Sequence, residues 1–156
     1  MRKGFIGMGV MGFPMAGHLS LNGFDVCIFN RSQEKASNWV TQFNGIMCNS
    51  PSDMASQCDI IILCVGKDED VKDVICGENG ILKSIKPGTI IIDHTTTSAI
   101  LAKDMNQILQ DKKAYFLDAP ISGGQAGAEG GKLSVMVGGD EQAFTKVRDI
   151  LGSYSK

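Results

Sequence analysis

The sequence predicts an α/β fold, in which one doubly wound, mainly parallel sheet is covered by helices on both faces. Short apolar runs alternate with helical patterns up to about residue 117, and this alternation is typical of parallel sheets with right-handed crossovers. Residues 59–65 are almost continuously apolar, as expected for a central parallel strand covered on both faces, and the run 89–93 is expected to form another strand. A glycine-rich turn follows the first apolar run, where the first strand meets the first helix.

The expected elements follow one another with short connections. The first strand ends at residue 6, and the helix after it carries apolar residues at Met11, Met15 and Leu19 and ends at 22–23. The other strands are expected in the two central runs and at 25–29, 46–48 and 114–117. The other helices are expected at about 32–43 with Ser32 as N-cap, from 50–52 with an early proline, at about 68–75 and at about 99–110.

The chain changes character after residue 117. Residues 118–131 are rich in glycine and too irregular for a regular element. Residues 133–137 are expected to form a strand added at the edge of the sheet, and 141–151 a terminal helix. With 43% hydrophobic residues, the 156 residues suffice for one domain with a sizeable core, so a single domain, 1–156, is predicted.

Composition and charge exclude several classes of function. The net charge of −2 without a basic cluster argues against nucleic-acid binding. There is no apolar run of about 18 residues, so no membrane-spanning segment is expected. The start resembles neither a secretory signal nor a transit peptide, so a cytoplasmic protein is expected. The five cysteines form no C-x-x-C pair, and we expect reduced thiols rather than disulfides or metal ligands.

Residues 5–16 give the strongest functional signal, because they contain a G-x-G-x-x-G turn between a strand and a helix. Gly7 permits the tight turn, Gly9 lets the backbone approach a pyrophosphate, and Gly12 lets the helix pack closely on the strand. The helix N-terminus then offers N–H groups and a positive dipole end to phosphates. An ordinary strand-to-helix turn is the alternative. The predicted cofactor-binding turn comprises Gly7, Met8, Gly9, Val10, Met11 and Gly12.

The end of the second strand favours NADP over NAD. An acidic residue at this place binds the adenosine ribose of NAD, but here Asn30 stands 18 positions after Gly12, with Arg31 beside it. A guanidinium pairs with a 2′-phosphate, which a carboxylate would repel. Lys35, one helical turn further, supplies a second cation. The alternative is that Arg31 and Lys35 are solvated surface charges.

Further candidates lie at the ends of later strands. Val65 and Thr96 are placed to touch the nicotinamide half of the cofactor, although residues 95–98 also suit a helix cap. Ser122, Gly123 and Gly124 offer a hydroxyl and open N–H groups to a substrate carboxylate, unless they form only a flexible surface loop. We regard His94 as structural. No catalytic residue is assigned in this chain.

These blocks resemble the β-hydroxyacid dehydrogenase family, which includes 3-hydroxyisobutyrate dehydrogenase, tartronate semialdehyde reductase and glyoxylate/succinic semialdehyde reductase. The similarity rests on residues 5–16, on Asp118-Ala119-Pro120-Ile121-Ser122-Gly123-Gly124 with Gly127, Ala128 and Gly131, and on Met136-Val137-Gly138-Gly139. Asn30-Arg31-Ser32 with Lys35 is similar to the branch that prefers NADP. His18 departs from the family, in which Asn is usual. Together the blocks span nearly the whole chain, as the cofactor domain of a Rossmann-type enzyme.

The resemblance implies hydride transfer between NADP(H), or less readily NAD(H), and a short β-hydroxy acid or its semialdehyde. It implies that Ser122, Gly123 and Gly124 hold the substrate carboxylate. The proton-transferring lysine of the family belongs to an all-helical second domain, which this chain does not contain, so the chain alone is expected to be inactive. A homo-oligomer is expected at full length. A non-catalytic module that binds NADP or another protein is the alternative.

Overall fold

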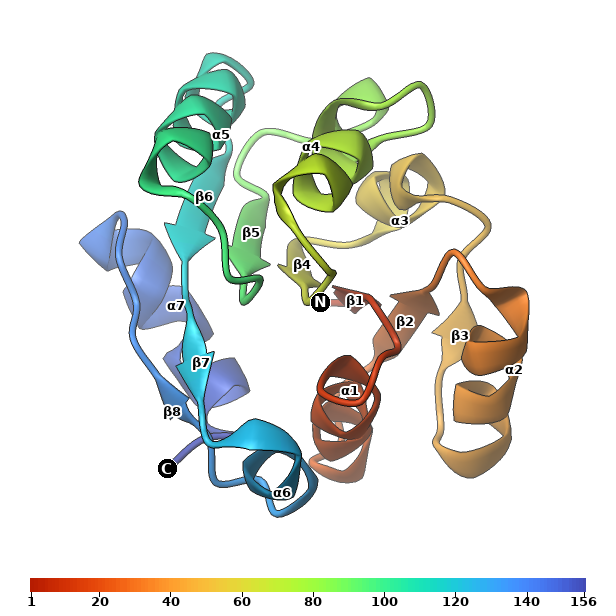
Figure 1. Cartoon of the computed structure of the whole chain (residues 1–156). Helices are drawn as coiled ribbons and strands as arrows, with labels where there is room; N and C mark the ends of the chain where they lie inside the picture. The colour runs from red at the N-terminus through yellow and green to blue at the C-terminus, as the bar shows by residue number, and fades with distance from the viewer.

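A computed structural model describes residues 1–156, and it confirms the doubly wound α/β architecture of Rossmann type (Figure 1). Six parallel strands form one sheet in the order β3-β2-β1-β4-β5-β6. The glycine-bearing strand β1 therefore lies inside the sheet, between β2 and β4. The strands are β1 (Lys3–Ile6), β2 (Val26–Phe29), β3 (Ile46–Met47), β4 (Ile60–Leu63), β5 (Ile90–Asp93) and β6 (Tyr115–Asp118).

Helices cover both faces of this sheet. In Figure 1, α3, α4 and α5 lie on one side of the strands, and α1 and α7 lie on the other. One 3-10 turn, Ile81–Lys83, precedes β5. The helices are α1 (Gly12–Leu21), α2 (Gln33–Gln42), α3 (Pro51–Gln57), α4 (Asp68–Cys76), α5 (Ala99–Asp111), α6 (Gly124–Glu129) and α7 (Glu141–Leu151).

The two faces of the sheet bury separate hydrophobic cores. Along β4, Ile60 and Ile62 point into the core shared with α1, α2 and α7, whereas Ile61 and Leu63 point into the core shared with α3, α4 and α5. Successive strand side chains alternate between faces, so a strand covered on both sides needs an unbroken apolar run. This is why β4 and β5 were readable from sequence. Truncating one such side chain to Ala typically costs about 2–5 kcal/mol.

Polar caps set the starts of several helices. Ser50 Oγ accepts from the N–H of Asp53 at 3.0 Å, in the helix whose start was predicted from Ser50-Pro51. Ser98 caps α5 through the N–H of Leu101, at 3.2 Å. Ser32 precedes α2 as predicted, but its side chain makes no capping hydrogen bond.

The segment after β6 differs from the prediction in two ways. Residues 118–131 are not irregular throughout: they contain β7 (Ile121–Ser122) and the short helix α6. The expected edge strand shortens to β8 (Ser134–Val135), which pairs antiparallel with β7 in a separate ribbon, and a single bridge between Asp118 and Gly138 joins this region to the main sheet. Gly123, at φ +133°, turns the chain sharply between β7 and α6. The glycines that predicted an irregular segment therefore mark the turn between two short regular elements.

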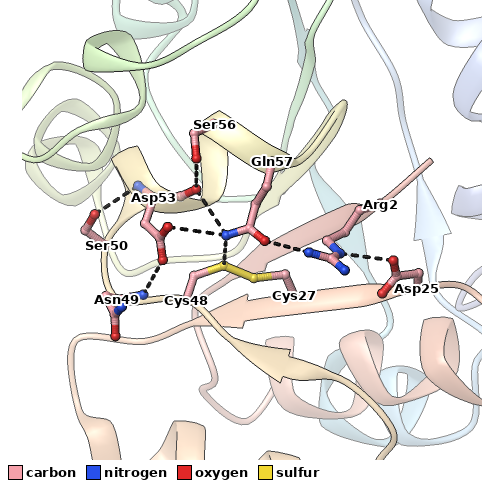
Figure 2. Close-up of a disulfide and its surroundings, with 9 residues drawn as sticks. All are labelled: Arg2, Asp25, Cys27, Cys48, Asn49, Ser50, Asp53, Ser56 and Gln57. Carbon is pink, nitrogen blue, oxygen red and sulfur yellow. Dashed lines mark hydrogen bonds and ion pairs between the residues drawn. A yellow bond between two sulfur atoms is a disulfide. The ribbon is translucent and has the colours of Figure 1, made fainter.

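The expectation of five reduced thiols is wrong for two of them, because a disulfide joins Cys27 and Cys48 (Figure 2). Cys27 lies on β2 and Cys48 directly follows β3, and these strands are neighbours in the sheet. The pairing of β2 with β3 brings the two Cα atoms to 6.2 Å from each other. The spacing of the cysteines in the sequence does not show that these strands are neighbours. Cys58 and Cys64 are free, and burial raises the pKa of each thiol to about 12. No helix has the length and apolar character needed to cross a membrane.

Candidate functional site

A cleft of about 650 Å³ opens at the carboxyl ends of β1, β2 and β4. The chain leaves β1 toward β2 on one side and reaches β4 on the other. Doubly wound sheets bind their ligands at such a point, where the strand order reverses. The lining includes nine of the residues predicted to bind a cofactor: Gly7, Gly9, Val10, Met11, Gly12, Asn30, Arg31, Lys35 and Val65.

The glycine turn is shaped by close backbone approaches. Gly7 has a φ of +106°, and a Cβ there would collide with the carbonyl oxygen of Cys64 at the end of the neighbouring strand. A Cβ on Gly12 would collide with the carbonyl oxygen of Gly7, so only glycine lets α1 start this near to β1. Gly9 differs, since a Cβ there would meet nothing within 4 Å. The space that a side chain at Gly9 would fill is therefore open cleft and is not packed with protein atoms.

Four consecutive backbone N–H groups in this turn lack a partner. The N–H groups of residues 9–12 donate no hydrogen bond within the chain, whereas that of Phe13 already donates to the Gly9 carbonyl as α1 begins. All four residues line the cleft. Successive free N–H groups at a helix N-terminus form a binding place for anions, strengthened by the helix dipole.

Asn30 fixes the turn from the neighbouring strand. Its Oδ1 accepts from the N–H of Met8 at 2.9 Å, and its Nδ2 donates to the carbonyl oxygen of Ser32 at 3.0 Å. Both polar groups of the amide are thus engaged by the backbone. Met8 and Ser32 do not line the cleft themselves. They belong to the support that holds the glycine turn against the end of β2.

Charged side chains of both signs meet in the cleft. Arg31 and Lys35 line it, and so do Asp70, Asp73 and Glu78. Sequence reasoning missed these carboxylates, although the acidic first turn of α4 was a visible signal. Nη1 of Arg31 lies 3.8 Å from Oδ1 of Asp70, so one ion pair joins the end of β2 to α4.

The wall of the cleft at the start of α3 includes residues that sequence reasoning also missed, Asn49, Ser50 and Pro51. Figure 2 shows how it is held: Asn49 donates its backbone N–H to Asp53 at 2.9 Å, and Cys48 next to it is tied to β2 by the disulfide. Gln57 donates to the backbone and side-chain oxygens of Asp53, at 3.3 Å each. The wall is therefore fixed on both sides of Asn49.

Val65 and Thr96 are placed differently. Val65 lines the cleft, and its N–H donates to Thr95 Oγ1 at 3.1 Å, which links the ends of β4 and β5. Thr95 in turn donates its N–H to Asp93 Oδ1 at 2.9 Å. Thr96 is exposed and lies outside the cleft lining.

Ser122, Gly123 and Gly124 are exposed at the junction of β7 and α6, and none of them lines the cleft. This segment is nevertheless attached to α1, beside which α6 lies in Figure 1. Nε2 of His18 lies 3.0 Å from the carbonyl oxygens of Ala128 and Glu129. Carbonyl oxygens only accept, so this nitrogen carries the proton and donates to both.

His94 is buried, and both of its ring nitrogens make hydrogen bonds. Its Nδ1 donates to the carbonyl oxygen of Ala119 at 2.6 Å, and its Nε2 accepts from the hydroxyl of Tyr154 at 2.7 Å. Burial lowers the pKa of His94 to about 4, so the ring is neutral at physiological pH. Beside it, burial raises the pKa of Asp93 to about 6, and Oδ2 of Asp93 has no hydrogen-bond partner.

Comparison with known proteins agrees with this geometry. The sequence pattern of the NAD-binding domain of 6-phosphogluconate dehydrogenase matches residues 2–156. The chain belongs to this family. An uncharacterized oxidoreductase of Shewanella frigidimarina is 48% identical to this chain over 152 residues, which cover 97% of this chain and 52% of that protein.

Two solved structures share the fold. The 3-hydroxyisobutyrate dehydrogenase of Mycobacterium tuberculosis, solved with L-serine, has a TM-score of 0.89 and 30% identity, over 99% of this chain and 52% of its own. The protein Psf3, in complex with NADP+ and 2-OPP, has a TM-score of 0.93 and 27% identity, over 98% and 54%. The resemblance to dehydrogenases of the 3-hydroxyisobutyrate type is confirmed. The NAD-binding domain spans about half the length of these relatives.

Proposed function

We propose that this domain binds NADP(H) in preference to NAD(H), with the diphosphate at the glycine turn and the 2′-phosphate beside Arg31 and Lys35. The unpaired N–H groups of residues 9–12 carry this proposal, because unpaired donors at a helix N-terminus form a binding site for an anion such as the diphosphate. Arg31 and Lys35 line the same cleft, and the residue after β2 is an amide rather than the carboxylate that favours NAD. The complex of the related Psf3 with NADP+ supports this choice.

Calorimetric titration of the 156-residue chain with NADP+ and NAD+ tests the proposal. Gly9→Ala is the sharpest variant, since the added methyl group meets no protein atom and yet occupies the space proposed for the diphosphate. We expect the fold to survive and binding of both nucleotides to weaken by at least about tenfold. Gly138→Ala is the matched control, because its Cβ would meet only the Asp118 oxygen at 3.9 Å. Binding unchanged by Gly9→Ala, or tighter binding of NAD+ by the unaltered chain, would contradict the proposal.

For the protein to which this domain belongs, we propose hydride transfer between NADP(H) and a short β-hydroxy acid or semialdehyde. The names of the relatives support the reaction class, and the exposed Ser122-Gly123-Gly124 turn offers a hydroxyl and N–H groups to a substrate carboxylate. No lysine of this chain is assigned the proton transfer, so the domain alone should show negligible turnover. Reduction of glyoxylate or succinic semialdehyde by the isolated chain would refute that division of labour.

The competing proposal is a module that binds NADP, or another protein, without catalysis. The position of Ser122, Gly123 and Gly124 outside the cleft lining leaves room for it. A panel of semialdehydes assayed with the longest natural form of the protein separates the two: turnover favours the enzyme, and nucleotide binding without turnover favours the module. Homo-oligomerisation and a cytoplasmic location stay predictions, which sedimentation and cell fractionation of that form would test.

A further inference from the structure

We propose that Asp70 determines how strongly the cleft distinguishes NADP from NAD, by holding Arg31 and yielding it only to a 2′-phosphate. The inference rests on the proposed function, binding of a dinucleotide at the glycine turn. It assigns to α4 a part in cofactor choice that is usually sought only at the end of β2.

Geometry makes Asp70 the fixed partner of the pair and Arg31 the movable one. Oδ2 of Asp70 accepts from the N–H of Lys67 at 3.1 Å, which locks the carboxylate at the start of α4. The Asp70 side chain is 24% exposed, whereas that of Arg31 is 91% exposed. The guanidinium can therefore leave the carboxylate without disturbing the protein around it.

The pair also lies on the route of the nucleotide. Arg31 follows β2 and Asp70 follows β4, and the strand between these two is β1, whose glycine turn offers the free N–H groups. An NADP molecule that places its 2′-phosphate at Arg31 competes with Asp70 for the guanidinium, whereas NAD has no anionic group that does so. Asp70 consequently opposes NADP binding and leaves NAD binding nearly unaffected.

The charges of the cleft add to this opposition. Two cations, Arg31 and Lys35, face the three carboxylates of Asp70, Asp73 and Glu78. A phosphate monoester brings about −1.5 to −2 charges at pH 7. Among the three carboxylates, only Asp70 is paired with Arg31. Its effect on NADP should therefore exceed that of its neighbours.

Titration of the full 156-residue chain with NADP+ and NAD+ tests the inference through Asp70→Asn. The amide keeps an acceptor oxygen for the N–H of Lys67, so α4 is retained. We expect about fivefold tighter binding of NADP+, a gain of the size that releasing an exposed ion pair allows, and less than about a twofold change for NAD+. Asp73→Asn is the matched control: it removes the same charge from the same helix and cleft without freeing Arg31.

The outcomes separate the inference from the proposed function. A gain for NADP+ from Asp70→Asn in the parent chain, with no gain from Asp70→Asn in a chain that already carries Arg31→Gln, supports the inference, because the double-mutant cycle then shows coupling between the two residues. An unchanged NADP to NAD affinity ratio, or an equal gain in Asp73→Asn, overturns it while leaving dinucleotide binding intact. Absence of binding of either nucleotide by the unaltered chain and all variants overturns the proposed function, and this inference with it.

Discussion

The hydroxyl of Tyr154 donates a hydrogen bond of 2.7 Å to Nε2 of His94, and both side chains are buried. The pair joins the C-terminal segment to the end of β5. Since Nδ1 of His94 donates to Ala119, the tautomer is fixed and Nε2 depends on Tyr154 for its only partner.

Tyr154→Phe should therefore lower the free energy of unfolding by about 1–3 kcal/mol, because it leaves a buried acceptor unpaired. Urea unfolding followed by circular dichroism measures the change. Tyr115→Phe is the control, as Tyr115 is half-buried and its hydroxyl makes no hydrogen bond within the chain. Equal losses in the two variants would show that the His94 contact contributes nothing particular.

The stability of the fold should depend on pH through two groups, His94 and Asp93, whose contributions change in opposite directions. The pKa of His94 falls from 6.5 to about 4 on burial, so between these values the unfolded chain binds more protons and acid destabilises the fold. The pKa of Asp93 rises from 3.8 to about 6, so the folded chain binds more protons there, and the stability contributed by the protonated form is lost as the pH rises through 6. The two effects nearly cancel between about pH 4 and 6.

Asp93→Asn removes one side of this balance while keeping an acceptor for the N–H of Thr95. We expect the variant to lose about 3 kcal/mol between pH 6.5 and pH 4, and the unaltered chain much less. Urea unfolding at a series of pH values checks this. Parallel pH profiles for the two proteins would contradict the raised pKa of Asp93, and a variant whose stability does not fall in acid would contradict the buried, neutral His94.

Reduction of the Cys27–Cys48 disulfide should destabilise the domain by about 3 kcal/mol, since the bond closes a loop with a sequence separation of 21. Thermal unfolding with and without a phosphine reductant gives the difference. Cys48→Ser should behave like the reduced chain and be insensitive to reductant. Cys76→Ser, at an exposed free thiol, should melt like the parent. Intact-mass analysis of the unaltered chain after denaturation and alkylation should find three thiols rather than five.

Ser122→Ala, made in the longest natural form of the protein, should raise KM for the carboxylate substrate by about tenfold, as expected for one lost hydrogen bond, with KM for NADP unchanged. Ser134→Ala is a close control, because Ser134 pairs with Ser122 across the ribbon of β7 and β8. Steady-state kinetics with each substrate varied in turn would decide. An equal effect of both variants would argue for a structural role of the ribbon.

Sequence reasoning predicted best where burial imposes a pattern. β4 and β5 are covered on both faces, and α7 begins and ends where its pattern indicated. It failed where contacts between distant segments decide. The disulfide depends on β2 and β3 being neighbours, and the carboxylate of Asp70 enters the site only because β4 lies next to β1. β8 pairs with β7 and not with the main sheet, and β7 was not predicted because a strand of two residues has no recognisable pattern.

The unpartnered N–H groups of residues 9–12 have a practical consequence for the bench. An anion-binding site made of backbone N–H groups does not discriminate among small oxyanions, so sulfate or phosphate from the buffer will compete with the dinucleotide for this site. Affinities measured in phosphate-buffered saline should accordingly come out weaker than those measured in a zwitterionic buffer at matched ionic strength.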